Sequence, residues 1–219
     1  IKSAWLASRV KGQIHGYSWR SAREPLASLF YSNTHFISKD VHAVERIRML
    51  FASALGYSSV GLDYQGIKNL HWQKPKDQLA GYGLVFPGTT WFTKHWVPDY
   101  WREFLKHIDS NQTIWVGWGT PEEKEFALSL ASESSNVHCF DRWLSLDEMA
   151  SWVAHAEWVV GVDTGFVHLA SAMQVPTVGI FGPTDPNRCG VLGAHNKNAN
   201  VELPCMPCHK KLCQNLASS

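Results

Sequence analysis

The sequence lacks several features that would have placed it in familiar functional classes. It has no Gly-x-Gly-x-x-Gly and no Walker sequence, which argues against a dinucleotide oxidoreductase and against a P-loop enzyme. Its 20 Lys and Arg residues are balanced by 19 Asp and Glu residues, so no basic field for nucleic acid stands out. Its apolar runs all stop well short of the roughly 20 residues that a spanning helix needs, so no transmembrane segment is expected.

Cysteine is scarce and odd in number, which argues against a disulfide framework. Of five cysteines only Cys205, Cys208 and Cys213 cluster, and this pattern favours a reducing compartment. With His209 they offer four zinc ligands, but no second Cys-x-x-Cys follows. A reduced turn is therefore the preferred interpretation, and no metal is expected.

The first residues do not form a secretory signal. The apolar run of residues 1–10 is short and is broken by Ser and Arg. The chain also begins without Met and within a pattern. We therefore expect an N-terminus that is truncated relative to the natural protein.

From Tyr82 onward, apolar runs of strand length alternate with helical patterns. Ser145 with Glu148 three residues later is a capping box, the signature of a helix start. The alternation predicts a parallel sheet covered on both faces, and hence a Rossmann-like α/β domain. Strands are predicted over 82–86, 113–117, 136–140, 158–163 and 177–181, and helices over 97–108, 121–133, 145–156 and 165–174.

The residues before Tyr82 are less regular. Residues 40–55 predict an amphipathic helix stopped by Gly56, and residues 21–31 are helical in part, interrupted by Pro25. Residues 57–79 lack apolar periodicity and are predicted to be a linker. The predicted domains are 1–75, the C-terminal part of an N-terminal domain with its linker, and 76–219, a nucleotide-sugar-binding domain.

Polar groups follow the first strand of the predicted sheet. Ligands of open parallel sheets bind beyond the carboxyl ends of the strands. There Thr89, Thr90 and Lys94 offer hydroxyls and an ammonium group that suit a phosphate or pyrophosphate. Lys94 taken alone would more often be an ordinary solvated lysine.

A second group follows the strand that ends near residue 162. Gly165 lets a ligand approach the start of a helix, where free N–H groups bind anions, and His168 lies one turn later. Asp163 suits sugar hydroxyls better than phosphate. The ordinary alternatives are an Asp that caps a strand-to-helix turn and a His that belongs to the core or surface. Taken with the first loop, the pattern predicts a nucleotide-sugar site.

Three stretches carry a resemblance to a known family. They are "YSWRSAREPLASLFY", "FPGTTWFTKHW" and "VVGVDTGFVHLASAMQVPTVGIFGPTDP". The chain resembles the ADP-heptose–lipopolysaccharide heptosyltransferases of glycosyltransferase family 9 from Ile1 to about residue 198. "SAREPLASLFY" with "HAVERIRMLFASALGY" points to the branch that adds the first heptose.

This resemblance implies a GT-B architecture, in which the active site lies between two Rossmann-like domains. It implies inverting, metal-independent transfer of L-glycero-D-manno-heptose from ADP-heptose to Kdo of Kdo2-lipid A, in lipopolysaccharide inner-core synthesis. No cofactor is implied. The enzyme is expected to be cytoplasmic and peripheral to the inner membrane of a Gram-negative bacterium. The catalytic Asp of the family is expected upstream of residue 1, and its final helix beyond residue 219.

The resemblance also implies roles for particular residues. A Glu that binds ribose in the family falls by simple spacing at Lys124, between Glu123 and Glu125, and Glu123 is assigned to it. Arg23 is implied to bind the anionic acceptor. The other implied donor contacts are Thr89, Thr90, Lys94, Thr164 and Gly165 for pyrophosphate, Asp163 for heptose hydroxyls, His168 for donor phosphate and Leu144 for adenine.

Three other interpretations stay open at this point. The chain could be a noncatalytic nucleotide-sugar-binding fragment without the base, or a family member that uses a UDP- or GDP-sugar. A zinc-stabilised interaction domain is the third. Asp163 and Leu144 do not decide the base or the sugar by physics alone.

Overall fold

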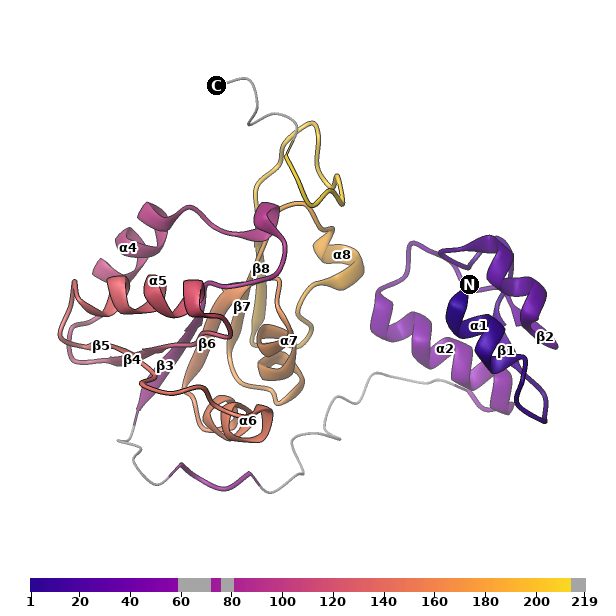
Figure 1. Ribbon diagram of the computed structural model, residues 1–219, viewed down its shortest axis with the longest axis horizontal. Coiled ribbons are helices and arrows are strands. Elements are labelled where there is room, and N and C mark those ends of the chain that lie inside the picture. The colour runs from indigo at the N-terminus through magenta and orange to yellow at the C-terminus, as the bar shows by residue number, and fades with distance from the viewer. Residues whose placement is uncertain (59–71, 76–80, 214–219) are drawn as a thin grey trace. The chain divides into compact units, whose positions relative to one another are not determined.

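The computed structural model describes residues 1–58, 72–75 and 81–213. The chain divides into two compact units. Residues 1–58 make up most of the first, and residues 81–186 and 190–213 most of the second. Both are drawn in Figure 1.

The predicted linker and domain boundary lie largely outside the described residues. The linker, expected over 57–79, falls mostly on 59–71 and 76–80. The boundary expected near residue 75 adjoins the second of these segments. Both stay predictions.

The first unit is a small α/β arrangement. Strand β1 pairs in parallel with β2, and the predicted helix α2 ends at Gly56. Gly56 has φ 73°, a left-handed conformation that glycine adopts without steric cost. The elements are α1 (Lys2–Ala7), β1 (His15–Tyr17), the 3-10 helix η1 (Pro25–Phe30), β2 (Asn33–His35) and α2 (Ala43–Leu55). The first helix and both strands were not predicted, because they are too short to show periodicity.

The second unit contains a six-stranded sheet in which all strands are parallel, as predicted. The order is β5-β4-β3-β6-β7-β8. The strands are β3 (Tyr82–Phe86), β4 (Thr113–Val116), β5 (Val137–Cys139), β6 (Trp158–Val162), β7 (Thr177–Phe181) and β8 (Asn196–Asn200). The chain runs outward from β3 through β4 to β5, returns to β6 beside β3, and runs outward the other way. This is the doubly wound Rossmann order, which opens a crevice at the carboxyl ends of β3 and β6.

Helices cover both faces of this sheet (Figure 1). Successive side chains of β3 point to opposite faces: Leu84 and Phe86 pack with α6 and α7, whereas Val85 packs with α4 and α5. The helices on the two faces are α4 (Pro98–Lys106), α5 (Pro121–Ala131), α6 (Leu146–Ala154) and α7 (Gly165–Ala172). Two short helices, η2 (Phe92–Lys94) and α8 (Pro186–Cys189), follow β3 and β7 in the chain. Among the described residues no helix combines the length and apolarity that crossing a membrane requires.

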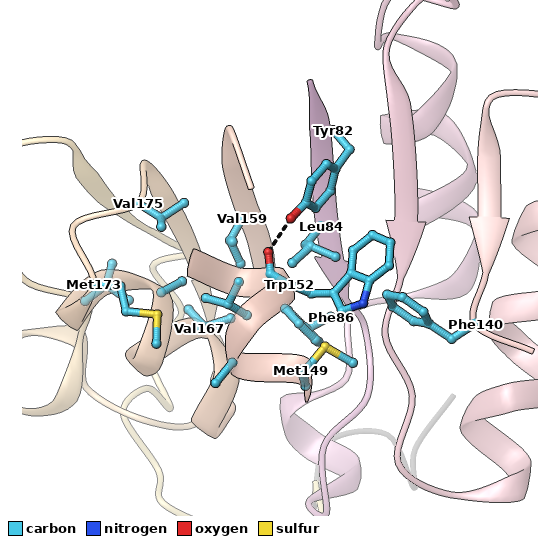
Figure 2. Packing of buried hydrophobic residues seen from close by; sticks show 14 residues of the cluster. Tyr82, Leu84, Phe86, Phe140, Met149, Trp152, Val159, Val167, Met173 and Val175 are labelled. Carbon is cyan, nitrogen blue, oxygen red and sulfur yellow. Dashed lines mark hydrogen bonds between the residues drawn. The ribbon is translucent and has the colours of Figure 1, made fainter. Parts of the chain in front are cut away.

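One core cluster anchors the strand that leads to the crevice. Figure 2 shows Tyr82 donating its hydroxyl hydrogen bond to the carbonyl of Trp152, at 2.5 Å, with Phe140 and Met149 nearby. The predicted capping box is present at the start of α6, because Ser145 accepts from the N–H of Glu148 and the Glu148 carboxylate accepts from the N–H of Ser145. The start of β3 is thereby tied to α6, a helix whose own first turn is capped.

The last strand, β8, was not predicted from the sequence. Its residues, Asn-Lys-Asn-Ala-Asn, are polar because it forms an edge of the sheet and is largely exposed. Backbone pairing with β7 and two amide side chains hold it: the Asn196 carbonyl accepts from the N–H of Thr177, and the Asn198 carbonyl from the N–H of Val191. Hydrophobic patterning cannot reveal such a strand.

Candidate functional site

Polar side chains from neighbouring strand ends meet in one cleft of about 470 Å³. The cleft lies in the second unit, beyond the carboxyl ends of β3 and β6. Most of the predicted donor-binding residues line it, namely Thr89, Thr90, Lys94, Glu123, Asp163, Thr164, Gly165 and His168. The crevice expected of the fold therefore coincides with the cluster expected from the sequence.

Asp163 is the centre of this cluster. Its side chain is 8% exposed, and its Oδ2 lies 2.8 Å from Nζ of Lys94. The same oxygen accepts from Oγ1 of Thr184 at 2.7 Å, and Oδ1 lies 3.1 Å from Nε2 of His168. Three groups, from η2, from the loop after β7 and from α7, thus converge on one buried carboxylate.

These contacts keep the carboxylate ionised. Burial raises the pKa of Asp163, but hydrogen bonds from His168, Lys94 and Thr184 outweigh the burial and hold that pKa well below the ordinary range. A buried negative charge beside Lys94 in turn compensates the ammonium charge. Both residues of this ion pair line the cleft.

The amino end of α7 is open toward the cleft. Its N-cap residue is Thr164, and neither Thr164 nor Asp163 caps the helix with its side chain. The interpretation of Asp163 as a simple helix cap is therefore wrong. A Cβ placed on Gly165 would meet nothing within 4 Å, so the first-turn N–H groups of α7 are accessible to an anion.

The loop after β3 is tied to the same point. The Thr89 hydroxyl donates to the carbonyl of Asp163 at 3.4 Å, and the ring of His95 donates to the carbonyl of Thr89 at 2.6 Å. The short helix η2 then turns the chain back so that Lys94 faces Asp163. Residue 94 therefore reaches the cleft from a segment that the sequence predicted only as a loop.

Of the two acids that flank Lys124 in α5, Glu123 is the one that lines the cleft. Its Oε2 accepts from the N–H of Gly119 at 2.7 Å, and a Cβ on Gly88 would approach its carboxylate to 2.3 Å. Lys124 lies elsewhere, because its Nζ donates to the carbonyl of Asp141 at 2.6 Å and sits 4.9 Å from the Trp118 ring centroid. Contact of Glu123 with a ribose stays a prediction.

Two predicted residues are not among those that line the cleft. Leu144 is half-buried against the core cluster of α6 and α7, beside the start of α6. Arg23 is exposed in the first unit, just before η1. Their contacts with adenine and with the acceptor stay predictions.

Sequence reasoning missed Thr184 as a member of the site. It is 9% exposed and donates to Asp163, from the Gly-Pro-Thr-Asp-Pro loop after β7. Its position beyond a strand next to β6 was the available signal. Phe86 and Phe166, whose rings stack at 5.1 Å, also line the cleft and were not predicted.

The cysteine-rich stretch does not form a metal centre in the structure. Among the residues described, no group of three or more His, Cys, Asp or Glu side chains is arranged to hold a metal ion. Cys205, Cys208 and Cys213 are free thiols.

A second hollow of about 540 Å³ lies at the amino ends of the sheet's strands, away from the cleft. Its walls include Trp158 and Thr177, which begin β6 and β7, together with Phe104 of α4. In parallel α/β sheets ligands bind at the carboxyl ends of strands instead. The cleft around Asp163 is therefore the better candidate for the functional site.

The sequence matches glycosyltransferase family 9 (heptosyltransferase) over residues 1–218. Lipopolysaccharide heptosyltransferase 1 of Pseudomonas aeruginosa is 41% identical, over 97% of this chain and 60% of that protein. Lipopolysaccharide heptosyltransferase 1 of Escherichia coli K12 is 42% identical, over 92% of this chain and 63% of that protein. The chain thus spans about three fifths of the length of these relatives.

Solved structures agree with this result. The E. coli heptosyltransferase WaaC with ADP has a TM-score of 0.83 and 40% identity, covering 92% of this chain and 63% of that one. The same protein with ADP-2-deoxy-2-fluoro heptose gives 0.77 and 40%, covering 90% and 62%.

Proposed function

Because the chain belongs to glycosyltransferase family 9, we propose that it is the donor-binding part of a heptosyltransferase that transfers heptose from ADP-heptose to Kdo of Kdo2-lipid A. The cleft around Asp163 is the proposed donor site. The observation that carries the proposal is the convergence of Lys94, Thr184 and His168 on that carboxylate, beside an uncapped helix start. The names of the relatives support heptose transfer in lipopolysaccharide synthesis, and a solved relative that holds ADP-2-deoxy-2-fluoro heptose supports the donor.

The diphosphate is proposed to bind at the open end of α7. First-turn N–H groups and the partial positive charge of a helix start favour anions. The hydroxyls of Thr89 and Thr90 offer further donors, and Lys94 is held at the cleft by its ion pair. His168 is proposed to contact a donor phosphate.

The sugar is proposed to bind at Asp163. A carboxylate has about four acceptor positions, and three are used by Lys94, Thr184 and His168. One remains for a heptose hydroxyl. Leu144 and Glu123 are the proposed partners of adenine and ribose, and Arg23 of the anionic acceptor.

The proposed reaction is an in-line displacement at the anomeric carbon. An acceptor hydroxyl oxygen forms the new bond to that carbon, its proton passes to a base, and the bond to the β-phosphate oxygen breaks to release ADP. Lys94 and the start of α7 would stabilise the charge that develops on the departing phosphate. The proposed location is the cytoplasmic surface of the inner membrane.

A transfer assay distinguishes this function from a noncatalytic one. The natural protein that contains this chain is incubated with ADP-heptose and Kdo2-lipid A, the mass of the lipid is measured by mass spectrometry, and ADP release is followed. Addition of one heptose supports the transferase. Binding of ADP-heptose without transfer supports the alternative of a nucleotide-sugar-binding module, whereas failure of both contradicts the donor site.

A further inference from the structure

The C-terminal segment of residues 203–213 is hydrogen-bonded to η2 and to the loop after β7. The hydroxyl of Thr93 donates to the carbonyl of Lys210 at 2.6 Å. The N–H of His209 donates to the carbonyl of Pro183 at 2.9 Å. Thr93 immediately precedes Lys94, and Pro183 precedes Thr184. The segment is therefore tied to both loops that supply partners to Asp163.

This packing brings a second ammonium group toward the site. Nζ of Lys211 lies 5.4 Å from the ring centroid of Trp91, and Nζ of Lys94 lies 4.9 Å from the same centroid. The two ammonium groups are thus no farther apart than the sum of these distances. An indole ring attracts cations, so Trp91 holds Lys211 in the neighbourhood of Lys94, which lines the cleft.

The charge balance of the cleft gives Lys211 a role. Lys94 is paired with the buried Asp163 carboxylate, so together they offer an anion little net positive charge. Lys211 is exposed, and within residues 1–58, 72–75 and 81–213 no carboxylate lies in ion-pairing range of it. A diphosphate that enters the cleft therefore meets Lys211 as a nearby cation whose charge is not compensated.

We propose that Lys211, held by Trp91, is a second cationic residue for the diphosphate of the nucleotide donor. Its ammonium group attracts the phosphates on approach and contacts them once bound. The inference rests on the proposed function, because it takes the cleft around Asp163 to be the site of a nucleoside diphosphate.

Titration calorimetry of the full chain with ADP and with adenosine, at low and moderate salt, tests this role. Lys211→Gln should weaken ADP binding about tenfold and reduce its salt dependence, while adenosine affinity stays unchanged. Lys211→Arg should restore ADP binding. The control is Lys197→Gln. It removes the same charge from β8, beside the hollow at the amino ends of the strands, and should leave ADP affinity unchanged.

Different results would overturn the role of Lys211 and the proposed function. ADP affinity that Lys94→Ala reduces and Lys211→Gln leaves intact would overturn the role of Lys211 alone. Equal losses for ADP and adenosine in Lys211→Gln would assign the residue to structure and overturn the charge role. If the unmodified chain binds no ADP, the proposed function and this inference both fail.

Discussion

Lys94 and Asp163, which lie far apart in the sequence, form a largely buried ion pair of 2.8 Å at the switch point of the parallel sheet. Lys94 ends η2, the short helix after β3, and Asp163 directly follows β6. Because β3 and β6 are neighbours in the sheet, the fold itself brings the two residues together. The ion pair in the cleft therefore depends on this pairing of β3 with β6.

Replacing Lys94 by Ala should weaken ADP-heptose binding by about 1.5–3 kcal/mol, the scale of a hydrogen bond to a charged group. The variant loses a donor on the cleft wall and leaves Asp163 without one of its three partners. Titration calorimetry measures the effect. Lys106→Ala, which removes an exposed lysine from the end of α4, serves as the control. Equal affinities of wild type and Lys94→Ala would refute the assignment.

Stability should fall on acidification, in part because of Asp163. Its pKa is held low in the folded chain, whereas an unfolded aspartate titrates near about 3.9. The unfolded state therefore binds this proton first, so the stabilisation is complete above the ordinary pKa and is lost as pH falls through it toward the folded value. The free energy of unfolding in urea, measured from pH 6 to pH 3, should decrease more steeply for wild type than for Asp163→Asn.

Glu148 also has a lowered pKa, so the free energy of unfolding of Asp163→Asn should still decrease somewhat on acidification. The Arg142 side chain, with the N–H and hydroxyl of Ser145, lowers the pKa of Glu148 to about 2. It adds a slope of the same sign, which persists in Asp163→Asn. Parallel pH profiles for the two proteins would contradict the low pKa of Asp163.

Gly161, within β6, and Gly165, the first residue of α7, should respond differently to replacement by Ala. A Cβ on Gly161 would lie 2.7 Å from Cγ2 of Val167 and 2.8 Å from the carbonyl oxygen of Phe86, so Gly161→Ala should cost about 1–3 kcal/mol of stability. Gly165→Ala meets no neighbour and should keep its stability, yet weaken ADP binding because the methyl group stands at the open helix start. Thermal unfolding and calorimetry separate the effects. Unchanged ADP affinity in Gly165→Ala would argue against a phosphate at α7.

Glu123 should control recognition of the ribose. If its carboxylate binds ribose hydroxyls, Glu123→Ala should abolish the preference for ADP over 2′,3′-dideoxy-ADP, a contribution of about 1.5–3 kcal/mol. Glu125, exposed on the same helix, is the matched control. Competition binding of the two nucleotides gives the preference directly. A preference that survives in Glu123→Ala but disappears in Glu125→Ala would reverse the assignment.

The sequence predicts those parts of the molecule whose patterns are local. The strands around Leu84 and Val160 are apolar runs, and α6 carries a capping box, so each could be located without a structure. Strand β8 could not, because an exposed edge strand of Asn and Lys has no hydrophobic pattern.

The sequence also could not predict which segments at the strand ends contact one another. It indicated that Lys94 and Asp163 lie at strand ends, but their pairing depends on the strand order and on the turn of η2. Thr184 was missed for the same reason, since its partner is on another strand end. The acid of α5 that faces the cleft also required helix geometry, because simple spacing pointed to Lys124.

The most direct test of the account is calorimetric titration of this chain with ADP-heptose, with UDP-glucose as the control ligand. The account predicts saturable binding of ADP-heptose that is weakened in Lys94→Ala, and no comparable binding of UDP-glucose. Equal affinity for the two nucleotide sugars, or binding of ADP-heptose that does not depend on Lys94, would contradict a donor site built around Asp163.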